Sequence, residues 1–224
     1  MDTALQKNKT FPDVELNLVM VHGVWSDGNA MDEMATRFTV DRRLGELNAK
    51  VSVIKYGKLL LSVGRVPFVR KLVSNYIASR LATCTYKYPN AKTIVLAHSF
   101  GTWAIAQAIR DLFLEFRLDM AILVGSVIPR NYDWSGYGIA VHNFVGKKDR
   151  VVLSSALWGT GWSGRYGFHE GDSNVIQYFM DWDHDDYPKG YNQYVEIIRN
   201  MNKLDSGKEG QPCRFSFKKF VTEW

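Results

Sequence analysis

The sequence predicts an α/β fold, in which a mostly parallel sheet of about six strands has helices on both faces. Short apolar runs, typical of fully buried strands, alternate along the chain with stretches whose apolar residues recur at helical spacing. Such alternation indicates parallel strands joined by helical crossovers. The chain has 224 residues, 46% of them hydrophobic, and can therefore bury the core of one such domain.

The six expected strands are short and rich in β-branched and aliphatic residues, except the last, which mixes aromatic and polar residues. No internal repeat interrupts them. They are expected at Leu16 to Val21, Val51 to Ile54, Thr93 to Ala97, Met120 to Val124, Ile139 to Val145 and Asn174 to Met180.

Four amphipathic helices are expected between and after these strands. Pro67 can open the second helix, because proline is well tolerated in the first turn, and the last helix follows Pro188. The apolar stripes that predict the helices are Met31, Met34, Ala35 and Phe38; Val69, Leu72, Val73, Tyr76, Ile77 and Leu81; Ile105, Ile109, Leu112, Phe113 and Phe116; and Tyr191, Tyr194, Val195, Ile198 and Met201.

The third expected strand runs directly into a serine and then a helix. The segment reads Ala97-His98-Ser99-Phe100-Gly101, with a small residue two positions to each side of the serine. A larger side chain at either position would collide with the neighbouring backbone, because the turn is sharp. The segment resembles the nucleophile elbow of the α/β-hydrolase superfamily, with alanine in place of the first glycine of its G-x-S-x-G motif.

The resemblance extends from about Leu16 to Met201 and implies a three-layer α/β-hydrolase fold of the serine esterase or lipase-like branch. Before Leu16 there is no room for the superfamily's first two strands. The fourth and fifth expected strands are too close in sequence to enclose a folded cap. We therefore expect a minimal form of the fold.

A nucleophilic serine needs a general base, and the base needs a carboxylate that orients it. In the superfamily the acid and the histidine follow the serine in that order. Asp149, just past the fifth strand, resembles the acid, with Asp133 after the fourth strand as its competitor. His184, between the sixth strand and the last helix, matches the base, with His169 as its rival.

The oxyanion donors are expected in two backbone segments. The residue after the nucleophile, Phe100, should offer its N–H at the start of a helix. The first strand ends in His22-Gly23-Val24, which resembles the His-Gly-x oxyanion loop of lipases and esterases and nominates the N–H of Val24. Gly23 lets the backbone come close to the substrate.

Tryptophans supply the candidates for the substrate pocket: Trp25, Trp158 and Trp162. The last two belong to a glycine-spaced aromatic segment, Leu157 to Gly171. Such a segment suits a mobile loop over an apolar acyl pocket, or a set of surface aromatics that pack on one another.

No metal and no organic cofactor is expected. Cys84 and Cys213 form no metal-ligand pair. The aspartates around His184 resemble the opening of a calcium loop, but Asp186 stands where that loop requires glycine and Asn192 where it requires glutamate.

Composition bounds the partners and the location. The net charge of +5 is modest and spread out, and no nucleic-acid motif is present. No apolar run approaches the roughly 18 residues of a transmembrane helix, so only peripheral membrane contact stays open. Two cysteines make no disulfide framework, and the polar amino terminus lacks the apolar core of a secretory signal, so the expected location is cytoplasmic.

Two regions are expected along the chain. Residues 1–204 form the hydrolase domain, and residues 205–224 form a polar linker with an aromatic and basic tail, where Phe215, Phe217 and Phe220 could contact a protein partner.

The expected function is a serine hydrolase that cleaves a small-molecule or lipid ester through an acyl-enzyme. The alternatives are an acyltransferase or phospholipid-directed effector with the same triad, and an inactive binding module.

Overall fold

The computed structural model describes residues 13–23, 28–56, 66–112, 114, 116–155, 159–169 and 173–205. Within them one six-stranded sheet forms, and every strand pairs in parallel with its neighbours. The expected α/β fold with a parallel sheet is confirmed. The strands are β1 (Leu16–Val21), β2 (Ala49–Ile54), β3 (Lys92–His98), β4 (Met120–Val124), β5 (Ala140–Gly146) and β6 (Val175–Met180).

The strand order β2-β1-β3-β4-β5-β6 reverses direction once. The chain steps from β1 outward to β2, then crosses back to β3 and continues outward on the other side. The carboxyl ends of β1 and β3 therefore lie side by side, with Val21 opposite Ala97. Crevices at such a switch point are the usual ligand sites of open parallel sheets.

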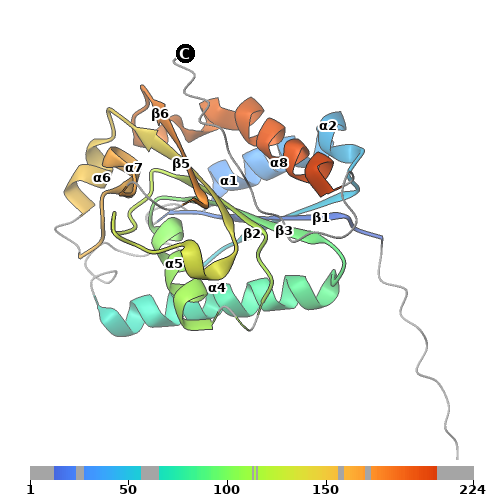
Figure 1. Ribbon diagram of the computed structural model, residues 1–224, viewed down its shortest axis with the longest axis horizontal. Helices are drawn as coiled ribbons and strands as arrows, with labels where there is room; N and C mark the ends of the chain where they lie inside the picture. Colours follow the sequence, from blue (N-terminus) through green and yellow to red (C-terminus); the bar gives the residue numbers. More distant parts are fainter. Residues whose placement is uncertain are drawn as a thin grey trace, which may run out of the picture.

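Helices cover both faces of the sheet, which gives three layers (Figure 1). One face carries α4 (Pro67–Lys87) and α5 (Phe100–Leu112). The other carries α1 (Asn29–Val40), α2 (Arg42–Gly45) and α8 (Tyr191–Asp205). Because side chains alternate along a strand, each strand contributes to both apolar cores.

The carboxyl edge of the sheet also carries short helical segments in its connecting loops. Those in the loops after β5 and β6 are α6 (Arg150–Ser155), α7 (Ser163–Tyr166) and η4 (His184–Gly190). A further short segment, η2 (Ser135–Tyr137), ends just before β5 begins and so lies towards the amino edge of the sheet.

The buried stripe of α4 differs from the expected one. Leu72 and Tyr76, expected in the stripe, are exposed, whereas Val73, Ile77 and Leu81 are buried. Ser74 and Ala78 are buried beside them. Helical spacing alone fits two adjoining faces, and the face with small residues is the one on which α4 can approach a neighbouring helix closely.

Some expectations fall outside the described residues. They include the tail at 206–224 and the residues Val24, Trp25 and Trp158. The residue at which the expected linker begins, Asp205, is the last residue of α8. Among the described helices, none combines the length and the apolar character needed to span a membrane.

Candidate active site

Ser99 stands between the end of β3 and the start of α5 with a left-handed backbone, φ 56°. This conformation is costly for a residue with a side chain and persists only where the surroundings enforce it. The backbone N–H of Ser99 donates to the carbonyl of Val124 at 3.0 Å. The hydroxyl of Thr102 donates to the carbonyl of Ser99 at 2.6 Å. These bonds and the helix start hold the serine in place.

Gly101 explains the small residue after the serine. A Cβ at this position would lie 2.6 Å from the carbonyl oxygen of His22 and 2.8 Å from that of Val21. The start of α5 therefore passes directly over the end of β1. This close approach brings the loop after β1 next to Ser99.

Three side chains from three loops form a hydrogen-bonded chain. The Nε2 of His184 lies 3.0 Å from the Oγ of Ser99, and its Nδ1 lies 2.8 Å from the Oδ2 of Asp149. All three residues are buried. Because an ionised carboxylate only accepts, Nδ1–H donates to Asp149 and the Nε2 lone pair faces the serine hydroxyl. The structure thus brings together the three residues that the sequence analysis nominated.

Local backbone structure positions Asp149. Its Oδ1 accepts from the backbone N–H of Val152 at 2.8 Å, as an N-cap of α6. Gly125, with φ 54°, provides the space for the Asp149–His184 pair. A Cβ on Gly125 would lie 3.1 Å from the His184 ring and 3.3 Å from Oδ2 of Asp149.

The acidic run around His184 stabilises its backbone. The Oδ1 of Asp183 accepts from the His184 N–H at 2.8 Å, and Asp186 accepts in turn from the Asp183 N–H at 3.0 Å. Lys148 pairs with Asp181 at 2.6 Å. Among the described residues, no group of three or more His, Cys, Asp or Glu side chains is placed to hold a metal ion.

A second buried histidine supports the first. The Nε2 of His98 donates to the backbone carbonyl of His184 at 3.0 Å, and its ring packs against those of His184 and Tyr187. Burial lowers the pKa of His98 to about 3. His98 is therefore a neutral donor that holds the His184 backbone.

The expected oxyanion loop is described only as far as Gly23. A Cβ there would lie 2.8 Å from the Cβ of Ser99, so only glycine fits without a shift. His22 stacks on Tyr56, whose hydroxyl donates to the His22 carbonyl at 2.5 Å. Burial raises the pKa of Tyr56 far above its usual range, so the hydroxyl stays protonated. Phe100 begins α5, where backbone N–H groups have no acceptor within the helix.

The two rival residues lie elsewhere. Asp133 is exposed, and its Oδ1 accepts from the N–H and hydroxyl of Ser135, which lower the pKa of the carboxyl. His169 is exposed and lines a pocket of about 360 Å³. In the described part of the chain, the carboxylate bonded to His184 is that of Asp149.

The aromatic segment 159–169 is partly core. Phe168 is buried and makes an edge-to-face contact with the buried Trp134, at 5.9 Å between ring centroids. Trp162 is 40% exposed, donates from Nε1 to the carbonyl of Leu153, and lines the same pocket as His169. Of the three nominated tryptophans, Trp162 alone lies in the described part of the chain.

Sequence reasoning missed several residues that shape this site. Thr102 bonds to Ser99 and also accepts from the N–H of Val127 in the loop after β4. Gly125 and Tyr56 contact partners from other loops. The one local signal for Gly125 is its place directly after a buried strand, where a polar or small residue opens a loop at the carboxyl edge.

Comparisons with known proteins place the fold. No family model and no curated protein matches the chain. A predicted CIB-like hydrolase from Thermoplasma acidophilum is 14% identical, with a TM-score of 0.53 over 86% of this chain and 88% of its own. A cold-adapted esterase from an Arctic intertidal metagenomic library is 12% identical, with a TM-score of 0.58 over 84% and 83%. TT1662 from Thermus thermophilus is 11% identical, with a TM-score of 0.58 over 84% and 90%.

Each of these similarities covers at least 84% of this chain. The protein has the α/β-hydrolase fold.

Proposed function

We propose that the protein is a serine hydrolase that cleaves a carboxylic ester through an acyl-enzyme intermediate. The observation that carries this proposal is the buried series of hydrogen bonds that joins Ser99 Oγ to His184 at 3.0 Å and His184 to Asp149 at 2.8 Å. The left-handed serine at a strand-to-helix turn supports it, because this geometry exposes a nucleophile beside backbone N–H donors. The hydrolases and the esterase with a similar fold support the same class.

Each residue has one role in the proposed reaction. The Oγ of Ser99 attacks the acyl carbon while Nε2 of His184 takes the hydroxyl proton. The Asp149 carboxylate keeps the proton on Nδ1 and stabilises the imidazolium that forms. The N–H of Phe100, with that of Val24 as the second proposed donor, stabilises the negative oxygen of the tetrahedral intermediate.

Collapse of this intermediate completes the first half of the reaction. His184 gives its proton to the leaving alcohol, and the acyl group stays on Ser99 as an ester. A water molecule then attacks the acyl carbon, with His184 taking its proton. The acid leaves when the proton returns to the Ser99 oxygen, which restores the starting state.

Turnover of 4-nitrophenyl esters with increasing acyl length tests the proposal. We expect Ser99→Ala to lower kcat by about 10⁴-fold or more, since removing the nucleophile disables the whole triad. The exposed Ser79 on α4 provides the matched control, and Ser79→Ala should turn over at the wild-type rate. Substantial hydrolysis by a folded Ser99→Ala variant would refute the proposal.

A further inference from the structure

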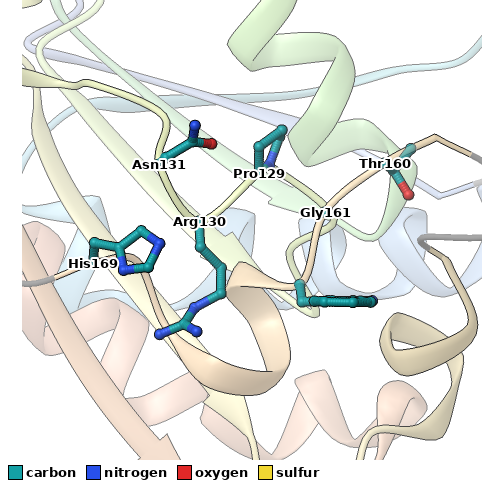
Figure 2. A pocket seen from close by; sticks show the side chains of 7 residues that line it. Pro129, Arg130, Asn131, Thr160, Gly161 and His169 are labelled. Atoms are coloured by element: carbon teal, nitrogen blue, oxygen red, sulfur yellow. The ribbon is translucent and has the colours of Figure 1, made fainter.

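A pocket of about 360 Å³ opens between the loop after β4 and the segment around α7 (Figure 2). One wall comes from the loop after β4, with Arg130 and Asn131. The other comes from the segment before and after α7, with Thr160, Trp162 and His169. We call it the Arg130 pocket. The proposed reaction assigns no role to it.

The backbone ties the Arg130 pocket to the catalytic residues. Gly125 packs on His184 and Asp149, and Pro129 of the pocket wall follows only four residues later. Four residues of extended chain span at most about 14 Å. The opposite wall is attached to the same segment, because Gly161 N–H donates to the carbonyl of Val127 at 2.7 Å. Both walls of the pocket are therefore attached to the loop that begins at Gly125, beside the catalytic residues.

The polar groups of the pocket favour an anion. The guanidinium of Arg130 is half-buried, and its Nε donates to the carbonyl of Gly167 at 2.9 Å, which fixes the planar head. Within the described part of the chain, its two Nη atoms carry no hydrogen bond, nor do the side chains of Asn131 and His169. No described lining residue is a carboxylate.

The arginine side chain is well suited to bind an anionic oxygen group. Its planar fork binds carboxylate and phosphate oxygens with two parallel hydrogen bonds. Figure 2 shows the His169 ring to one side of the Arg130 side chain, whereas the Asn131 side chain points away from the guanidinium. The exposed ring of Trp162 adds an apolar surface to the lining.

We propose that the Arg130 pocket binds an anionic oxygen group, a carboxylate or a phosphate, carried by the ester substrate. As a part of the substrate site, this inference rests on the proposed hydrolase function. Anion binding itself can be measured without turnover.

Isothermal titration calorimetry with succinate and with inorganic phosphate tests the binding step on the full chain. We expect saturable millimolar binding of at least one anion, and the anion that binds identifies the group. Arg130→Gln should weaken it about tenfold or more, because the variant loses the charge and the charge-assisted hydrogen bonds of the guanidinium. Arg130→Lys, which keeps the charge but loses the fork, should lie between. Arg80→Gln, an exposed arginine on α4, should bind as the wild type does.

Kinetics then test the substrate assignment. Mono-4-nitrophenyl succinate against 4-nitrophenyl butyrate places the anion on the acyl side, and 4-carboxyphenyl acetate against phenyl acetate places it on the alcohol side. For one pair we expect the anionic ester to have the higher kcat/KM in the wild type. Arg130→Gln should reduce that ratio about tenfold, and Arg80→Gln should not. The ratio within each variant cancels any general loss of folded enzyme.

Two outcomes would overturn the proposal: no saturable binding of either anion, or equal binding by the wild type and a folded Arg130→Gln variant. An unchanged kinetic ratio for both ester pairs would overturn the assignment to the substrate. Labelling of Ser99 by a fluorophosphonate separates the two proposals. With labelling but no anion binding, the hydrolase proposal stands and the pocket proposal falls. If Ser99 is not labelled, the hydrolase proposal is refuted, and calorimetry still shows whether the pocket binds an anion.

Discussion

At the level of single residues, the candidate site depends on positions where a side chain is absent. Gly23, Gly101 and Gly125 each lie where a Cβ would come within 2.6–3.1 Å of Ser99, of the backbone after β1, or of His184. The chain can therefore bring three loops into contact around one hydroxyl. Thr102 and His98 then hold the backbone carbonyls of Ser99 and His184 with hydrogen bonds of 2.6 and 3.0 Å.

The identity of the triad acid can be tested at this scale. We expect Asp149→Asn to lower kcat about 10³- to 10⁴-fold with little effect on KM, because an amide no longer fixes the productive tautomer of His184. Asp133→Asn is the matched control and should keep the wild-type kcat, since Asp133 bonds to Ser135 at the surface. Steady-state kinetics on one ester checks both variants. Equal losses in the two would contradict the assignment of Asp149.

At the level of elements, the site forms where β1, β3, β4 and β5 end. Parallel pairing in register sets these ends next to one another, and each following loop delivers one part: Gly23, Ser99, Gly125 and Asp149. The loop after β6 delivers His184, which is buried at the start of η4.

The close contact between α5 and β1 predicts a strong effect of one added methyl group. Gly101→Ala places a Cβ 2.6 Å from a backbone oxygen, which cannot rotate away, and we expect a loss of about 1–3 kcal/mol in the free energy of unfolding. Gly45→Ala, at the end of α2 with no atom within 4 Å of its new Cβ, should leave stability unchanged or raise it by less than about 1 kcal/mol. Urea unfolding measures both. Similar effects of the two substitutions would show that the elbow tolerates the methyl group.

An element can be predicted from the sequence where neighbouring residues in the chain determine which of its side chains are buried. The buried strands β1 and β4 could be predicted directly from their apolar runs. The buried face of α4 could not, because Leu72 and Val73 fit the helical period equally well, and packing by other helices decides which of them is buried. Tyr56 and Arg130 were also missed, since their roles depend on His22 and on the loop around Gly167, far away in sequence.

For the whole molecule, buried neutral histidines make stability depend on pH. Burial lowers the pKa of His142 to about 4 and that of His98 to about 3, from an ordinary 6.5. Below pH 6.5 the unfolded chain therefore binds protons that the folded chain does not. The free energy of unfolding consequently falls as the pH falls from 6.5 towards 4.

His142, which bonds to Tyr178 away from the triad, allows this dependence to be tested. We expect His142→Gln to remove about 1–2 kcal/mol of the stability difference between pH 6.5 and 5.0. His169→Gln, at an exposed histidine, should leave that difference unchanged. Urea unfolding at both pH values gives the difference for each protein. A difference in His142→Gln as large as in the wild type would contradict the neutral, buried state of His142.

The central claim is that the fold activates one serine, and labelling with a fluorophosphonate probe followed by peptide mapping tests it most directly. The wild type, Ser99→Ala and His184→Ala would be compared at equal concentration after their folding is verified. We expect a single adduct, on Ser99, that both variants lose, because the hydroxyl at 3.0 Å from His184 needs this base to react. A folded wild type that stays unlabelled, or an adduct on another residue, would contradict the account.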